Sequence, residues 1–132
     1  MKKVVANWKE IAPMKHPRSN FAAIAIGGAA YVFGGISGPD EIVAHSPVLV
    51  ADVVEIYKGR ENVWEVFEIP NAPKLAAFSW TAADEGEIFV LGGTDGNILQ
   101  TELHLIDFTR ATARRLPPIY PHCTGMGTLV FR

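Results

Sequence analysis

The side chains best suited to bind a metal ion are four histidines and one cysteine: His16, His45, His104, His122 and Cys123. Zinc and copper sites use such ligands where several of them converge. The histidines form no ligand pair on any one expected element, and the adjacent His122 and Cys123 would need further ligands. His104 alternates with leucines in "ELHLI", which is typical of a strand side chain. The sequence therefore predicts no metal site and no cofactor.

Catalytic and nucleotide-binding motifs are also missing. Serine, histidine and aspartate all occur, so composition leaves a catalytic triad open, but the motif G-x-S-x-G is absent. Two diglycines, at residues 34–35 and 92–93, follow strand-like runs. No helix pattern comes after them, so no helix N-terminus would hold a phosphate group. These features favour a protein that is not an enzyme.

Composition favours one globular domain. The 132 residues are 48% hydrophobic and 20% charged, with a net charge of -2 and scattered cations, so we expect binding neither to nucleic acid nor to a membrane. The longest apolar stretch, residues 21–36, contains four glycines and is too short to span a membrane. One cysteine cannot form an internal disulfide, and the N-terminal residues lack the apolar core of a signal peptide, which predicts a cytoplasmic protein.

A repeat becomes visible when spacings are compared. Tryptophans in "WKEIAP" and "WEVFEIP", Trp8 and Trp64, stand 56 positions apart. The two diglycines are 58 apart, and each follows an aromatic residue, Tyr31 or Phe89, three positions before its first glycine. The chain is thus expected to contain two similar units.

Each unit shows four short β-rich runs separated by Gly, Pro, Asn and Asp. The runs of the first unit are residues 21–26, 30–33, 53–57 and 63–69, and those of the second are 76–82, 87–91, 99–106 and 111–116. Windows with a helical period are lacking. Four strands in about 50 residues are typical of a β-propeller blade.

These motifs resemble the kelch-repeat family. The resemblance rests on "RSNFAAI" leading to "YVFGG", then "VVEIY" and "NVWEVFEIP", and "APMKHPRS" before the first run is most similar to the kelch domains of BTB-kelch adaptor proteins. It implies an all-β fold: an incomplete kelch-type β-propeller of about two four-stranded antiparallel blades plus an extra strand at each end. Structural roles are implied for the repeated positions: Trp8, Tyr31, Gly34, Gly35, Tyr57, Trp64, Phe89, Gly92 and Gly93. The second unit departs from the pattern, because Ala113 stands opposite Trp64.

The expected division of the chain has four parts. Residues 1–12 are predicted to be the fourth strand of a preceding blade, 18–70 one blade, 74–117 the next blade, and 121–132 the first strand of a following blade. Two and a half blades cannot close a ring. We therefore expect further blades from the same chain or from another one, in preference to a ring of identical copies.

Loops are the expected place for function, because propeller strands form a scaffold. The resemblance implies that loops before each first strand and after each diglycine share one face and bind a protein partner. The matching residues are Arg18, Ser19, Ser37, Lys74, Thr94 and Asp95, with Lys74 the loosest match. A longer loop in the first unit adds Asp40, Glu41 and His45, although a tolerated surface insertion would explain that loop as well.

We interpret the chain as a non-enzymatic module for protein-protein interaction through the loop face of a kelch propeller. One alternative is a structural subunit or fragment that docks by unpaired edge strands into a larger assembly. A second alternative is a fragment of a kelch-like propeller oxidase or hydrolase.

Overall fold

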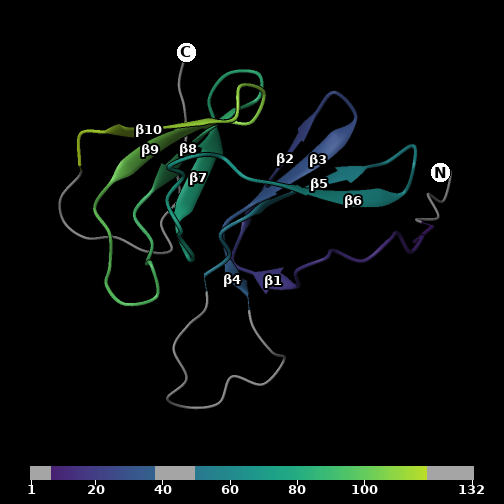
Figure 1. Ribbon diagram of the computed structural model, residues 1–132, viewed down its shortest axis with the longest axis horizontal. Coiled ribbons are helices and arrows are strands. Elements are labelled where there is room, and N and C mark those ends of the chain that lie inside the picture. Colours follow the sequence, from purple (N-terminus) through teal and green to yellow (C-terminus); the bar gives the residue numbers. More distant parts are fainter. Residues whose placement is uncertain (1–6, 38–49, 119–132) are drawn as a thin grey trace, which may run out of the picture.

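The computed structural model describes residues 7–37 and 50–118, and within them every regular element is a β-strand (Figure 1). Two antiparallel four-stranded sheets carry the fold. The first contains β2 (Ala22–Ile26), β3 (Ala29–Phe33), β5 (Val54–Lys58) and β6 (Val63–Phe67) in that order. The second contains β7 (Ser79–Ala82), β8 (Glu87–Leu91), β9 (Leu103–Asp107) and β10 (Thr112–Leu116). The prediction of two four-stranded blades in an all-β fold is confirmed.

Short connections follow from the turn residues. The pair Gly27-Gly28 joins β2 to β3, and Ile26 pairs with Ala29 across that turn. At the turn between β5 and β6, Asn62 adopts a positive φ of 55° and donates its N–H to the carbonyl of Lys58. Asparagine tolerates this conformation better than most residues. Each sheet is therefore a simple meander of neighbouring strands.

A two-stranded ribbon lies beside the first sheet. β1 (Arg18–Ser19) pairs with β4 (Ile36–Ser37), so Arg18 faces Ser37 and Ser19 faces Ile36. The same pairing recurs in the second unit as a single bridge between Ala76 and Thr94. Both pairings bring the segment before a first strand next to the residues after a diglycine, as the resemblance implied.

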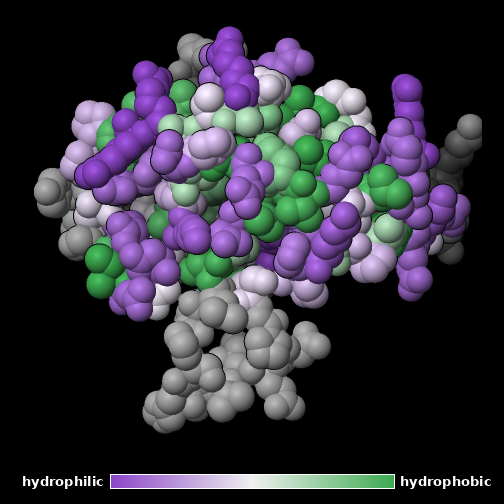
Figure 2. Space-filling model, in the orientation of Figure 1, coloured by the Kyte–Doolittle hydropathy of each residue, from purple (hydrophilic) through white to green (hydrophobic). Residues whose placement is uncertain are grey.

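The core lies between the two sheets. Strand alternation puts Ala22, Phe33 and Val54 on the face of the first sheet that packs against Ile88 and Ile106 of the second. Aromatic rings fill the remaining space: Tyr31 lies 5.4 Å from Phe108, and Phe33 lies 5.9 Å from Phe78, between ring centroids. Figure 2 shows hydrophobic side chains among hydrophilic ones on the surface seen in that view.

Tyr57 and Trp64, two of the positions with an implied structural role, pack on a different face of the first sheet. Their rings lie 5.2 Å apart and pair across β5 and β6 on the face turned away from the second sheet. Trp8 has an exposed fraction of 98%, and no strand is assigned to the described residues 7–12. The predicted strand at residues 1–12 therefore stays a prediction, and residues 121–132 lie outside the described part.

Three predicted runs differ from the observed strands by two or more residues at one end. The run at 99–106 becomes a strand only from Leu103, because Thr94 bridges Leu99 and Asp95 holds the residues between them in a turn. The run at 76–82 becomes a strand only from Ser79. The run at 63–69 ends as a strand at Phe67, and Ile69 beyond it is buried in the core.

Candidate functional site

The two diglycines determine the shape of one edge of the molecule. Gly34 and Gly35 have positive φ angles of 66° and 96°, a region that side chains disfavour. A Cβ atom at Gly34 would lie 2.6 Å from the carbonyl oxygen of Leu75, and one at Gly35 would lie 2.5 Å from that of Ser19. The Gly35 N–H also donates to Leu75 at 2.9 Å. Glycine is therefore required where the first blade meets the chain that enters the second.

We call this edge the loop face: it comprises β1, β4, residues 50–53, Lys74 and residues 92–102. In Figure 1, β1 and β4 lie along the lower side of the molecule. A pocket of about 160 Å³ opens there. Its walls come from the strand β1 segment and from the residues leading into β5, and its lining residues are His16, Arg18, Ser37, Val50, Ala51, Asp52 and Val53. The structure thus brings the predicted Arg18 and Ser37 together, and adds His16 and Asp52, which sequence reasoning missed.

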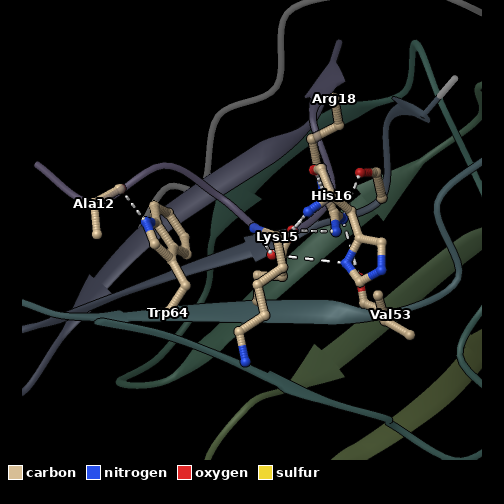
Figure 3. A network of polar contacts seen from close by, with 8 residues as sticks. Ala12, Lys15, His16, Arg18, Val53 and Trp64 are labelled. Atoms are coloured by element: carbon tan, nitrogen blue, oxygen red, sulfur yellow. Dashed lines mark hydrogen bonds and ion pairs between the residues drawn. The ribbon is translucent and has the colours of Figure 1, made fainter. Parts of the chain in front are cut away.

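Beneath the pocket lies a buried ion pair (Figure 3). The Nη2 atom of Arg18 lies 2.8 Å from Oε2 of Glu55, and neither side chain is exposed to solvent. The Nη1 atom of Arg18 donates to the carbonyls of Gly34 at 3.1 Å and Val53 at 3.0 Å. Because its charge and donors are used inside the fold, the guanidinium group of Arg18 holds the diglycine and the start of β5 in place.

Glu55 also collects backbone donors from the segment that precedes β1. The N–H of Lys15 donates to Oε1 at 2.7 Å, and that of His16 donates to the same oxygen at 3.2 Å. The His16 imidazole lies near this carboxylate, with Nδ1 at 3.7 Å from Oε1, yet its side chain stays 49% exposed. His16 therefore presents its ring at the wall of the pocket.

The same segment, residues 12–18, is held at its other end by β6 and the turn before it; we call it the strap. The indole Nε1 of Trp64 donates to the carbonyl of Ala12 at 2.6 Å (Figure 3). The N–H of Ala12 donates to Oδ1 of Asn62 at 2.8 Å, and the hydroxyl of Tyr57 donates to that same oxygen. Trp64 and Tyr57 therefore fix the strap, which positions His16 and Arg18.

The second unit has different residue types at the positions equivalent to Arg18 and Glu55. Pairing register matches Glu55 with His104, because they face Val32 and Val90 at equivalent points of β3 and β8. Counting back from the first strands matches Arg18 with Leu75. Leu75 has an exposed fraction of 3%, so Leu75, not its neighbour Lys74, fills the place of Arg18.

His104 is buried at the place where the first unit has a carboxylate. Its Nε2 lies 3.4 Å from Oε2 of Glu102, while its Nδ1 has no hydrogen-bond partner among the described residues. Burial lowers the pKa of His104 below its ordinary value, because desolvation disfavours the charged ring. Glu102 also binds Nη2 of Arg115 at 2.8 Å. Leu75 and His104 thus stand at the positions that the ion pair occupies in the first unit.

At the rim of the loop face an exposed ion pair connects the two units. Nζ of Lys74 lies 3.3 Å from Oδ2 of Asp52, and these side chains are 65% and 58% exposed. Lys74 thus lies next to the pocket through Asp52, and its role toward a partner stays a prediction. Such a pair is open to solvent and is available for exchange with a partner's charges.

Thr94 and Asp95 shape the loop that follows the second diglycine. The Asp95 Oδ1 atom accepts the N–H groups of Asn97 at 2.8 Å and Ile98 at 3.0 Å, and these bonds lower the pKa of the Asp95 carboxyl. Thr94 Oγ1 donates to the carbonyl of Ile98 at 2.9 Å and accepts the N–H of Gly96. The two polar side chains therefore form the loop, and their role toward a partner stays a prediction.

The remaining predicted residues are placed as follows. Ser19 and Ser37 belong to the β1–β4 ribbon, where Ser37 also lines the pocket. Asp40, Glu41 and His45 lie outside the described residues. Within residues 7–37 and 50–118, no group of three His, Cys, Asp or Glu side chains is placed to hold a metal ion. None of the described segments forms a helix of the length and apolarity needed to cross a membrane.

Comparisons with known proteins point to one type of repeat. Kelch-like protein 33 of Homo sapiens is 37% identical over 93 residues, which is 68% of this chain and 15% of that protein. A putative F-box/kelch-repeat protein of Arabidopsis thaliana is 27% identical over 86 residues, 65% of this chain and 22% of that protein. An N-acetylneuraminate epimerase of Pasteurella multocida is 32% identical over 92 residues, 69% of this chain and 23% of that protein. No family model matches the chain.

The solved structure of YjhT has the same kind of fold. It superposes with a TM-score of 0.68 and 17% identity over 86% of this chain and 42% of that chain. At this identity the likeness shows the fold, which is that of a β-propeller. The chain thus spans less than half of that structure and between 15% and 23% of the three curated relatives.

Proposed function

Because this chain is a partial kelch-repeat β-propeller protein, we propose that it is a non-enzymatic module that binds another protein through its loop face. The observation that carries this proposal is the pocket at that face, whose wall presents the half-exposed His16 ring and the exposed Asp52 carboxylate. Both groups form hydrogen bonds readily with a peptide or a side chain. The buried Arg18–Glu55 pair holds the pocket in shape before any partner arrives.

Preorganisation supports binding at this face. Ordering a loop or a side chain during association costs free energy, so a site that is already held in place binds more tightly. Here the strap and the residues around the pocket are held by six hydrogen bonds, which Trp64 and Arg18 donate and which Asn62 and Glu55 accept. Ser19, Ser37, Lys74, Thr94 and Asp95 border this surface, and Asp40, Glu41 and His45 remain proposed contributors.

The test compares two exposed ion pairs. Asp52 pairs with Lys74 on the loop face, whereas Glu65 pairs with Lys58 at 2.6 Å on the β5–β6 hairpin. Proteins captured from the natural source by wild type, Asp52→Ala, His16→Ala and Glu65→Ala would be identified and quantified by mass spectrometry. We expect Asp52→Ala and His16→Ala to lose the same captured protein, and Glu65→Ala to retain it. Equal capture by all four proteins would refute binding at the loop face.

A second candidate function is docking into a larger assembly by strand addition. It is favoured by Trp8, which is 98% exposed, while its repeat counterpart Trp64 packs on Tyr57 and donates to Ala12. A three-stranded blade in another segment or chain would give Trp8 the same kind of contacts. Trp8→Ala should then lower the mass of the native assembly, with Lys9→Ala as the control, and an unchanged assembly would contradict strand docking.

The other parts of the proposal follow the same reasoning. We infer protein partners without a nucleic acid or membrane component, and a cytoplasmic location. Because one relative is by name an epimerase, catalysis is the contrasting possibility, and a direct assay for it is given below.

A further inference from the structure

Two adjacent aliphatic side chains protrude from the loop face. Ile98 is 64% exposed and Leu99 is 49% exposed, and both lie in the loop that follows the second diglycine. Exposing two large aliphatic side chains next to each other is unfavourable in water relative to burying them. Single exposed aliphatic residues are common, whereas these two are adjacent and lie on the loop face.

The loop that carries this pair is held rigidly. The Gln100 N–H donates to the carbonyl of Gly93 at 2.8 Å, and its side-chain Nε2 donates to Oδ2 of Asp95 at 3.1 Å. Thr94 forms bridges with both Ala76 and Leu99. These bonds join the residues of the turn to one another and to the segment that precedes β7, so Ile98 and Leu99 are presented in a fixed conformation. Little conformational entropy would be lost if they entered a pocket.

Charges around the pair indicate the chemistry of the partner. Residues 96–101 are uncharged, and carboxylates stand at both ends, at Asp95 and Glu102. Glu102 is neutralised by Arg115 at 2.8 Å, whereas Asp95 has no cation within salt-bridge distance among the described residues. A complementary surface would thus be apolar at its centre and carry a cation on the side of Asp95.

We propose that Ile98 and Leu99 form an anchor that inserts into an apolar pocket of the partner protein, with a lysine or arginine of that protein facing Asp95. This inference rests on the proposed function, because the anchor belongs to the loop face. Small clusters of well-presented apolar residues commonly dominate the affinity of protein interfaces. We thus expect the anchor on the second blade to supply most of the binding affinity, and the polar pocket of the first blade to orient the partner.

The first test uses a photo-crosslinking residue, p-benzoylphenylalanine, at position 99. The control places it at position 63, since Val63 is 42% exposed but lies at the β5–β6 turn, at the opposite end of the sheet from β4. Irradiation in an extract of the natural source, followed by mass spectrometry, would locate the crosslinked site. We expect crosslinks from position 99 to apolar residues near a lysine or arginine of the partner, and none from position 63. Absence of crosslinks from position 99, or crosslinks to a charged flat surface, would overturn the proposal.

A second measurement separates the anchor from the loop face as a whole. Leu99→Asp should reduce capture of the crosslinked protein by at least about tenfold, while Val63→Asp leaves it unchanged. Urea midpoints of both variants should match wild type, because both side chains are exposed. If Asp52→Ala lowers capture and Leu99→Asp does not, the anchor is wrong and the loop face stands. If neither lowers capture, both proposals fail.

Discussion

Replacing Arg18 with leucine should destabilise the chain strongly, because the buried carboxylate of Glu55 would lose its cation. Both side chains are fully buried and their charged atoms lie 2.8 Å apart. Removing one partner of such a pair costs about 3–5 kcal/mol, since the other charge stays buried without compensation. The N–H groups of Lys15 and His16 still donate to Glu55 in the variant, so the loss should fall within this range and not exceed it.

The second blade supplies the rescue variant. In the second blade the positions of Arg18 and Glu55 are taken by Leu75 and His104. The double variant with Arg18→Leu and Glu55→His should therefore restore much of the stability lost in Arg18→Leu. Coupling between contacting residues is about 0.5–3 kcal/mol in double-mutant cycles, and we expect the upper part of that range here. Glu55→His alone should be strongly destabilised, because the guanidinium group would then be unpaired.

Urea unfolding followed by tryptophan fluorescence at pH 7.5 would measure all three variants. The control is Lys58→Ala, which removes a cation from the exposed pair with Glu65 and should change the midpoint little. A loss below about 1 kcal/mol for Arg18→Leu would refute the structural role of the ion pair. If the losses of unfolding free energy in the two single variants simply add in the double variant, the residue pair of one blade cannot replace that of the other.

Three further predictions concern other parts of the molecule. The pKa of His104 is lowered by burial, so the unfolded chain takes up a proton first; stability should fall as the pH drops below about 6.5, and urea midpoints of His104→Gln should depend less on pH in that range. Gly34→Ala should cost about 1–3 kcal/mol more than Gly28→Ala, because both glycines have positive φ but only a Cβ at Gly34 would meet Leu75 and Phe78; urea midpoints compare the two variants, and equal losses would disprove crowding at the diglycine. The purified chain should not epimerise N-acetylneuraminate, the compound named in one relative, above the uncatalysed rate by NMR; a rate proportional to protein concentration would replace the proposed function by an enzymatic one.

The strands could be predicted because their sequence signals are local. Runs of β-branched and aromatic residues end at Gly, Asn and Asp, and the repeat of the diglycine defines two units. Each of the eight blade strands accordingly lies inside a predicted run or extends beyond it by one residue. Where strand ends differ, as before Leu103, side chains of Thr94 and Asp95 hold the preceding residues in a turn, and this local competition is not visible in a pattern of apolar residues.

The candidate site was less predictable because its contacts join distant segments. Arg18 and Glu55 are separated by 37 positions, and sequence alone gave no reason to pair them. One signal was present: Glu55 interrupts the apolar run "VVEIY" at a buried position, and a buried carboxylate needs a donor or a cation. Whether Lys74 or Leu75 matches Arg18 depends on the register of the strands, which is seen only once the strands are paired in the sheet.

The two solutions at equivalent places also indicate where binding should be sought. At register-equivalent positions the first blade has the buried Arg18–Glu55 ion pair, and the second has the buried Leu75 and His104, whose pKa is lowered by burial. Each blade thus needs buried side chains without a net charge at these two positions, and more than one pair of residue types meets that need. Residues that are already used inside the fold in this way are poor candidates for binding a partner. The aliphatic pair at residues 98–99 has no such role inside the fold. We therefore expect this pair, and not Arg18, to decide whether a partner stays bound.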